Sequence, residues 1–298
     1  MPNAKHPSFR KYLHLHFLVF IWGFTAILGK LIRLDALMLT WYRVGLAILP
    51  LALLYALRKP KIRYSGKDYL RFALNGALIA LHWTAFFGAI KLGNVSSTLV
   101  ALSSGAFFAS LLEPWIYGRR IQKHEVFFGL TVVAGIGLIY GLSHIRFWAL
   151  AAALTAAFLS ALFSVWNGLL IQRYPARDLS FFELSSGFVL LSIIVLATGH
   201  VPHPAAVRPQ DWLWLAVLAW VCTSYTFTVS LDLLRHINPF SLMLAINMEP
   251  VYGIVLALIV FGESERMRPS FYLGAAVILG IIIWNSVLKM RGKNKSAS

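Results

Sequence analysis

The stretch Asp68-Tyr69-Leu70 opens an apolar segment, and a near copy, Asp211-Trp212-Leu213, opens another one 143 residues further along the chain. Glycines recur at nearly the same offset, of 144 or 145 residues: Gly118 as Gly262, Gly129 as Gly274 and Gly135 as Gly280. Landmarks that return at a constant spacing are typical of a chain built from internal repeats. The sequence therefore predicts two related halves.

Each half contains five apolar segments of membrane-spanning length, since about 20 apolar residues cross the hydrocarbon core as a helix. The predicted spans are 12–32, 36–57, 68–90, 95–117, 124–141, 147–171, 180–199, 211–234, 239–261 and 269–288. Two halves with an odd number of crossings have opposite orientations, and secondary transporters use such inverted repeats to build a site near the bilayer midplane. The predicted fold is an all-α integral membrane protein with ten transmembrane helices in two inverted five-helix repeats.

The composition agrees with a membrane protein. The 298 residues are 59% hydrophobic and 13% charged, whereas a soluble domain carries roughly 25% charged residues. We expect a cytoplasmic segment 1–11, repeats over 12–145 and 146–288, and a basic cytoplasmic tail 289–298. The first span is too long for a cleaved signal and no small-residue cleavage site follows it, so we expect it to be retained.

The formal net charge of +16 could indicate nucleic-acid binding, but the positions of the basic residues argue against it. With a cytoplasmic N-terminus, 19 of the 27 Lys and Arg residues lie in cytoplasmic segments and 7 lie outside. Cytoplasmic loops are enriched in these residues, so the distribution places both termini in the cytoplasm. The basic loops 58–67 and 289–295 then contact the lipid bilayer. We expect the bacterial inner membrane as the location and no nucleic-acid partner.

No motif of a soluble enzyme or a metal site stands out in the sequence. It lacks a Walker loop, an H-E-x-x-H motif and a Cys/His cluster with ligand spacing. The lone cysteine, Cys222, excludes an intramolecular disulfide. We therefore expect no enzyme activity, no metal and no other cofactor.

Two charged residues lie deep within predicted spans, where charges are costly and usually face the bundle interior. Arg43 lies in span 36–57, and Glu249 lies at the middle of span 239–261, followed by Pro250. Proline cannot donate to the carbonyl of Ile246, which weakens the helix beside Glu249. Arg43 would attract an anionic group through its planar guanidinium, and Glu249 would bind an amine or carry a coupled proton. The alternative is a structural Arg43–Glu249 ion pair that holds the halves together.

A second set of polar and aromatic residues lies within the other predicted spans. Its members are Asn75, His82, Trp83, Trp166, Asn167, Tyr225, Thr226 and Asn247, with Trp22 in the first span. The repeat offset pairs His82 with Tyr225 and Trp83 with Thr226, which predicts a shared central cavity that binds a small molecule. His82 could also carry a proton. For each of these residues the alternative is an interhelical hydrogen bond or simple packing.

Three further acidic residues lie nearer the cytoplasmic ends of predicted helices. Glu113-Pro114 looks like a copy of Glu249-Pro250, but the offset is 136 rather than 144, and the repeat alignment sets Glu249 opposite Gly105. We expect Glu113 to act as a gate or to pair with Arg119 or Arg120. Glu183 and Asp232 are expected to be solvated, or paired with Arg177 and Arg235 respectively.

The sequence resembles the EamA-type members of the drug/metabolite transporter superfamily over about residues 12–288. The resemblance rests on Trp22-Gly23, Trp41-Tyr42-Arg43, Asn247-Met248-Glu249-Pro250-Val251-Tyr252 and Phe261-Gly262-Glu263, followed by a glycine-bearing last helix. The first half departs from the pattern, since Gly105-Ala106 replaces Glu-Pro and Arg119 replaces the acid after glycine.

The resemblance implies an alternating-access carrier with a cavity lined by helices one, three, four, six, eight and nine. Helices five and ten would lie at the periphery. Their small-residue motifs, Gly137-x-x-x-Gly141 and Ala276-x-x-x-Gly280, suit tight packing within the bundle or in a homodimer. Family members move amino acids and other small metabolites, often outward.

We therefore predict a secondary-active carrier, working as an exporter, for a small organic metabolite such as an amino acid or derivative. The aromatic residues of the core helices suit an organic solute better than a bare ion. Two alternatives remain, a membrane-embedded lipid-modifying enzyme and an ion channel. The enzyme needs a catalytic cluster at an interface and the channel a continuous polar lining, whereas a pocket closed on one side favours the carrier.

Overall fold

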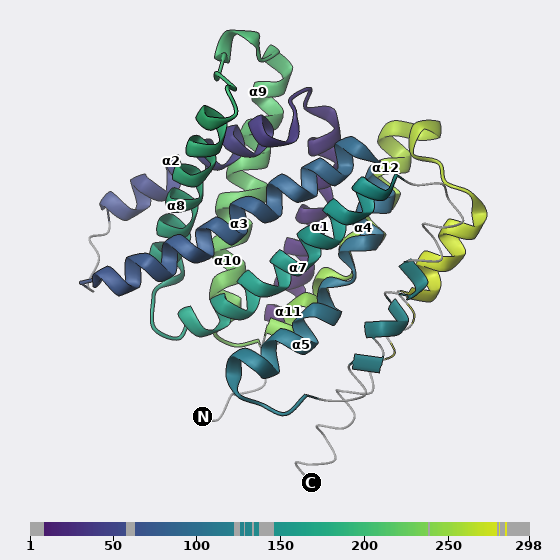
Figure 1. Cartoon of the computed structure of the whole chain (residues 1–298), viewed down its shortest axis with the longest axis horizontal. Coiled ribbons are helices and arrows are strands. Elements are labelled where there is room, and N and C mark those ends of the chain that lie inside the picture. The colour runs from purple at the N-terminus through teal and green to yellow at the C-terminus, as the bar shows by residue number, and fades with distance from the viewer. Residues whose placement is uncertain are drawn as a thin grey trace.

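The computed structural model describes residues 9–57, 63–121, 126–127, 129–132, 134–136, 146–237, 239–278, 280 and 284. Every regular element in that part of the chain is a helix (Figure 1). The α-helices are α1 (Phe9–Leu31), α2 (Ala36–Leu57), α3 (Gly66–Leu92), α4 (Val95–Leu102), α5 (Gly105–Tyr117), α7 (Phe147–Leu170), α8 (Ala176–Ala197), α9 (Pro209–Ala216), α10 (Thr226–Leu233), α11 (Pro239–Ile246) and α12 (Glu249–Phe261). A π-helix, η2 (Val217–Tyr225), joins α9 to α10, and η1 (Pro204–Ala206) and η3 (Gly262–Glu265) are 3₁₀ helices.

Seven helical segments within this description are long and apolar enough to cross a membrane. They are Leu13–Leu31, Ala36–Leu57, Gly66–Leu92, Val95–Tyr117, Phe147–Leu170, Ala176–Ala197 and Pro209–Leu233. Each corresponds to a predicted span. Of the other three spans, 124–141 falls partly outside the described residues, 239–261 is divided between α11 and α12, and 269–288 is described as an apolar helix over Pro269–Ile278.

Two predicted spans are interrupted at their centres, and the interruptions are equivalent. Ser103-Ser104 separates α4 from α5, and Asn247-Met248 separates α11 from α12. Adding 144 to the bounds of α4 and α5 gives the bounds of α11 and α12. The structure thus agrees with the repeat offset of this region, and the break at Asn247-Met248 agrees with the expected weakening of the helix beside Glu249, whereas the break at Ser103-Ser104 was not predicted.

The two interruptions have different local causes. Pro250 lies in the first turn of α12, where its missing N–H is tolerated, but it could not have continued α11. The equivalent residue of the first half is Ala106 (250 − 144), which would allow a continuous helix. There α5 packs closely against α11, because a Cβ at Gly105 would lie 2.6 Å from Met243 Cε. The break between α4 and α5 therefore coincides with close packing of α5 against α11, and the local sequence does not predict it.

The broken helices pack against each other in opposite directions. α4 packs against α12, and α5 packs against α11. In the same way α1 packs against α12, and its counterpart α7 packs against α5. The contact of α4 with α12 in one half thus corresponds to that of α11 with α5 in the other. The contact of α1 with α12 likewise corresponds to that of α7 with α5, as expected for a two-repeat architecture.

The ends of the helices form two opposite faces of the bundle. The loops after α1, α3, α8 and α12 form the first face, where Lys91 Nζ donates to the carbonyl of Ile32 at 2.6 Å. The loops after α2, α5, α7 and α10 form the second face. There Tyr64 Oη donates to Asp178 Oδ2 at 2.6 Å, and burial together with this bond raises the pKa of Tyr64. Each face thus has its own polar contacts.

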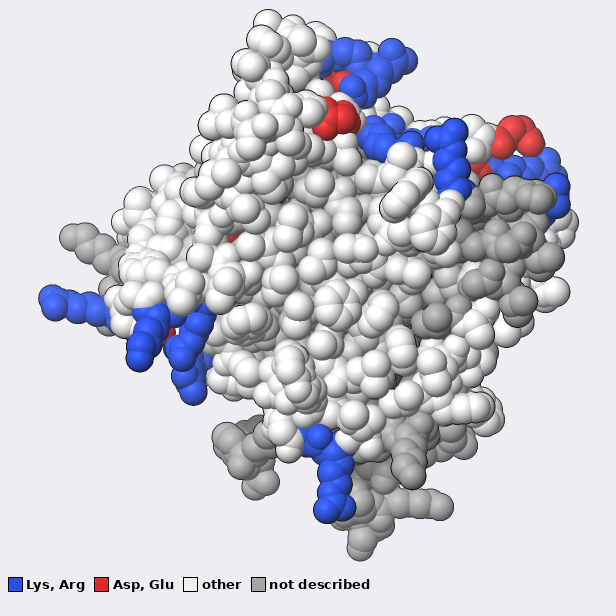
Figure 2. All heavy atoms as spheres, viewed as in Figure 1, with Lys and Arg blue, Asp and Glu red and all other residues white. Residues whose placement is uncertain are grey.

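Charged residues gather along two margins of the molecule, with a broad uncharged surface between them (Figure 2). Large apolar side chains are exposed on the outside of the helices, for example Leu53 (61%), Leu196 (72%) and Ile259 (74%). Trp115 near the second face and Trp148 near the first are exposed as well. An apolar surface of this extent needs lipid around it, and tryptophan is enriched at membrane–water interfaces.

Helices α3 and α8 cross at very short distance. A Cβ at Gly76 would lie 2.1 Å from the Glu183 carbonyl oxygen, and one at Gly187 would lie 2.7 Å from the Gly76 carbonyl oxygen. Real Cβ atoms do not approach oxygen this closely, so only glycine permits the crossing. It sets Asn75 of α3 against the side chain of Glu183.

We expect Gly76→Ala to destabilise the protein, because the added methyl group meets backbone rather than a movable side chain. Overpacking of this kind costs about 1–3 kcal/mol, more than the roughly 1 kcal/mol of helix propensity that alanine gains over glycine. The measurement is the midpoint of thermal unfolding of the purified protein in detergent. Gly66→Ala is the matched control, since nothing lies within 4 Å of a Cβ there. An unchanged midpoint for Gly76→Ala would contradict the close crossing.

Candidate functional site

A cavity of about 740 Å³, part of it open to solvent, lies where the broken helices meet. Side chains of α1, α2, α3, α4, α7, η2, α10, α11 and α12 line it. The family resemblance implied a lining from helices one, three, four, six, eight and nine. The structure adds α2, which contributes Arg43. From Arg43 and Glu249 the lining continues to Leu234 and Leu242, which lie toward the second face.

Arg43 is buried at the cavity wall and held by polar contacts with η2. Its Nε donates to Thr223 Oγ1 at 2.7 Å and its Nη2 to the Cys222 carbonyl at 3.5 Å. The guanidinium lies over the Trp83 ring, 4.1 Å from the centroid, an arrangement that stabilises a desolvated cation. Its Nη1 is buried without a hydrogen-bond partner. The cation therefore keeps one unused donor at the cavity.

Glu249 begins α12 and lines the same cavity with 5% of its surface exposed. A negative charge is favourable at a helix N-terminus. Among the described residues no basic side chain lies within 4.0 Å of its carboxylate. The alternative of a direct Arg43–Glu249 ion pair is therefore not realised in this structure. An acidic and a basic side chain thus face one cavity without forming a contact ion pair.

Aromatic rings complete the wall beside these charges. Trp22, Trp83 and His82 line the cavity as predicted, together with Phe86 and Phe163. His82 Nδ1 bonds to the Ala156 carbonyl at 2.7 Å, and since a carbonyl only accepts, this nitrogen carries the proton. Asn167 is the remaining predicted residue of the lining.

Six predicted residues lie outside the cavity lining. They are Asn75, Glu113, Trp166, Tyr225, Thr226 and Asn247. Asn75 bonds to Glu183, and Glu113 pairs with Arg119 at 3.4 Å, one of its two expected partners. Trp166 packs partly buried against the core, Thr226 accepts from Trp22 Nε1 at 3.0 Å, and Asn247 is buried in the break before α12.

The expected pairing of His82 with Tyr225 across the cavity is wrong. Tyr225 is 40% exposed and bonds to His14 at 2.9 Å. It closes the π-helix η2, whose wider i→i+5 turns change the direction of each following side chain. Thr223 and Ser224 bond back to the carbonyls five residues earlier, Leu218 and Ala219. A simple 3.6-residue period could not reveal this shift.

Glu183 and several small polar residues also lie where the sequence did not predict them. Glu183 is fully buried rather than solvated, and Arg177 pairs with Asp178 instead. Asp232 is exposed and pairs with Arg235, as expected. Thr25, Ser160, Ser164 and Ser230 line the cavity without having been predicted. Two of them, Ser160 and Ser164, could have been predicted, because they share one helix face with Asn167 at offsets of four and three residues.

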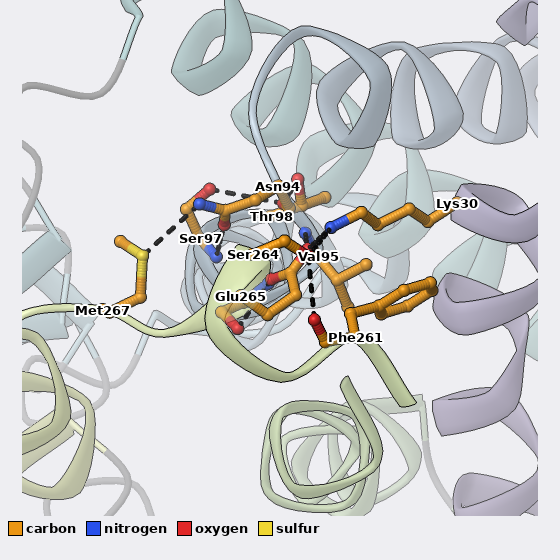
Figure 3. Close-up of polar contacts among 10 residues, drawn as sticks. Lys30, Asn94, Val95, Ser97, Thr98, Phe261, Ser264, Glu265 and Met267 are labelled. Carbon is orange, nitrogen blue, oxygen red and sulfur yellow. Dashed lines mark hydrogen bonds and ion pairs between the residues drawn. The ribbon is translucent and has the colours of Figure 1, made fainter. Parts of the chain in front are cut away.

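The first face is closed by contacts between the two halves (Figure 3). Glu265 of η3 is fully buried and accepts from the backbone N–H groups of Val95 and Ser96, both at 3.1 Å. It therefore caps the N-terminus of α4, where a carboxylate is favourable. Lys30 of α1 donates to Glu265 Oε1 at 2.7 Å and to Ser264 Oγ at 3.3 Å. One carboxylate thus ties α1, α4 and the end of α12 together.

Comparison with known proteins identifies a family for the chain. A family model described as the EamA-like transporter family matches residues 11–141 and 147–287. The chain belongs to this family. It is accordingly an integral membrane transporter of the drug/metabolite transporter type. No curated protein matches the chain.

A solved structure has the same fold as this EamA-like transporter. A crystal structure described only as that of a protein has a TM-score of 0.67 and 16% sequence identity. The match covers 95% of this chain and 99% of the other. At this identity the likeness concerns the fold alone.

The Glu265 contacts predict the side from which the cavity of this EamA-like transporter is reached. Cys222 is its lone cysteine and lines the cavity, so a small membrane-impermeant methanethiosulfonate reports access. We expect reaction from the second face in the native protein. Glu265→Gln should add reaction from the first face, because it removes the charge that holds Lys30 and caps α4.

The labelling is measured by mass spectrometry on vesicles of known orientation, with Cys222→Ser as the blank. Glu263→Gln is the matched control, since Glu263 lies in the same loop with its side chain 84% exposed and paired only with Arg266. Equal labelling of Glu265→Gln and native protein from the first face would contradict the closure.

Proposed function

We propose that this protein is a secondary-active, alternating-access carrier that exports a small zwitterionic metabolite, such as an amino acid or derivative, across the bacterial inner membrane. The observation that carries the proposal is that a basic and an acidic side chain line one cavity without pairing with each other. Arg43 keeps an unpartnered Nη1, and Glu249 has no basic partner within 4.0 Å in the described part of the chain. A molecule with a carboxylate and an ammonium group would satisfy both.

The chemistry of each group matches one end of such a solute. The planar guanidinium of Arg43 suits a carboxylate, and its contact with Trp83 supports the charge without using its hydrogen-bond donors. Glu249 would accept from the ammonium group. Trp22, Phe86 and Phe163 supply apolar surface for an organic side chain, and a cavity of this kind, mostly apolar with a few convergent polar groups, is typical of small-molecule sites.

The one-sided extent of the cavity lining favours a carrier over a channel. The cavity lining extends toward Leu234 and Leu242, while the first face is held by Glu265. None of the described lining residues belongs to the loops of the first face. A lipid-modifying enzyme is also less favoured, because the cavity lies among the helix breaks and not at a membrane interface.

The proposed topology follows the sequence prediction. We propose ten transmembrane helices in two inverted repeats, with the second face and both termini in the cytoplasm, so that the described state is open inward. Of the peripheral motifs, Gly137 and Gly141 lie outside the described residues. None of the described residues lies within 4 Å of a Cβ position at Gly280, and the homodimer through helices five and ten remains part of the proposal.

The proposal predicts which ligands stabilise the purified protein. Amino acids screened at about 100 times their dissociation constant should stabilise the native state by about 2.7 kcal/mol through mass action, seen as a higher melting temperature. Glu249→Gln should weaken the binding of amine-bearing ligands by about tenfold to hundredfold, because a hydrogen bond to a charged group contributes about 1.5–3 kcal/mol. Arg43→Ala should weaken carboxylate-bearing ligands.

The matched control is Asp232→Asn, an exposed acid paired with Arg235 at the second face, which should leave every ligand response unchanged. Each variant is first compared with native protein for its melting temperature without ligand. A response to amino acids that survives Glu249→Gln intact would contradict the role of Glu249. No response to any amino acid or small metabolite would contradict the substrate class.

A further inference from the structure

Glu183 is a buried carboxyl group that the cavity chemistry described above does not use. It lies on α8 with no exposed surface. Asn75 Nδ2 of α3 donates to its Oε1 at 2.8 Å, and Asn167 Nδ2 of α7 donates to its Oε2 at 3.3 Å. No ion pair to Glu183 forms within the described residues. The group is therefore held by two neutral amides from two other helices.

This arrangement does not suit a permanent charge. A buried carboxylate is stable when a cation or metal compensates it, and two neutral donors do so only in part. A carboxylic acid instead needs an acceptor for its proton. The Oδ1 atoms of Asn75 and Asn167 are both buried without a partner. Turning either amide over about its terminal bond would offer that acceptor, so the three side chains can satisfy both states of the carboxyl group.

None of the other charged or titratable groups described on the packed helices bonds to the Glu183 carboxyl group, and Tyr42 Oη of α2 is buried without a hydrogen-bond partner. Those with described contacts are Arg43 and Tyr55 on α2, Asp68, Arg71 and His82 on α3, and Asp232 on α10. On α7, the sequence from Phe147 to Leu170 contains no acidic or basic residue. On α8 itself, Asp178 pairs with Arg177 and accepts from Tyr64. Nothing in these contacts supplies Glu183 with a counter-charge.

One residue lies between the carboxyl group and the cavity. Asn167 bonds to Glu183 and also lines the cavity, next to Ser164 and Ser160 on the same helix face. Asn75, on the other side of Glu183, does not line the cavity. Among the described residues that bond to the Glu183 side chain, Asn167 is therefore the one that also lines the cavity.

We propose that Glu183, between Asn75 and Asn167, is a proton-binding site connected to the central cavity. Its use as the coupling group rests on the transport function proposed above, with Glu249 left to bind the amine of the substrate. Substrate binding and proton binding would then use different residues. Arg43 and Glu249 bind the charged groups of the substrate, and Glu183 binds the proton outside the cavity lining, next to Asn167.

Proton binding is tested without any substrate. Infrared difference spectra of the full-length protein in nanodiscs are recorded between acidic and alkaline pH, where a carboxylic acid C=O band gives way to carboxylate bands on titration. We expect Glu183→Gln to remove one such band and Glu249→Gln, the matched control, to leave that band in place. Identical spectra for Glu183→Gln and native protein would overturn the proposal.

A second measurement on native protein avoids the risk that Glu183→Gln fails to fold. Dicyclohexylcarbodiimide converts protonated carboxyl groups in apolar sites to N-acylureas, which peptide mass spectrometry locates. We expect modification of Glu183 that declines at alkaline pH. Modification of Glu249 at acidic pH, where that carboxyl group takes up a proton as well, shows that the reagent enters the cavity, and Glu265, paired with Lys30, should stay unmodified. Modified Glu249 with unmodified Glu183 at every pH would overturn the proposal.

The coupling role is tested separately in proteoliposomes, with an amino acid that stabilises the native protein. Glu183→Gln should lose uptake driven by a pH gradient while exchange of labelled for unlabelled substrate continues. Loss of both activities, or of neither, would overturn the coupling role. If the protein binds no such ligand but Glu183 titrates, the proposed substrate class fails and the proton site stands.

Discussion

The antiparallel packing of two broken helices is the constraint on which the rest of this structure depends. In a membrane every backbone polar group needs a partner within the protein, so interrupted helices are tolerated only where they are buried or line a cavity. Here α4–α5 and α11–α12 are broken at equivalent points and packed half against half. The cavity opens beside these breaks, and Glu249 stands at the first residue of α12.

The scaffold is repeated, but the chemistry placed on it is not. At the offset of 144 that relates the broken helices, Glu249 corresponds to Gly105, and Glu265 corresponds to Ile121. One half therefore supplies an acid to the cavity and the cap that closes the first face, while the other supplies small or apolar residues. Because a symmetric pair of caps would hold both faces equally, this asymmetry explains how one face is closed while the cavity extends toward the other.

The sequence predicted the two charged residues of the cavity lining correctly, but it misplaced Glu183 and Tyr225, whose surroundings depend on tertiary structure. Arg43 and Glu249 were found because an isolated charge in an apolar span has few reasons to be there. Glu183 was misjudged because it lies only eight residues into α8, near Arg177 and Asp178, where solvation looked sufficient. Tyr225 was assigned to the cavity because the repeat offset pairs it with His82, but the structure forms a π-helix through η2, which changes the direction of the side chains in that half alone.

The sequence by itself determined the membrane class, the two-part repeat and the presence of buried charges, because hydropathy, spacing and residue type are properties of the chain. Only the tertiary structure decided which of those polar groups share a cavity. The break at Ser103-Ser104, the close crossing at Gly76 and the pairing of Glu183 with Asn75 and Asn167 all depend on residues far apart in sequence. Their energies arise from packing and desolvation between helices, and no local pattern records which helices will meet.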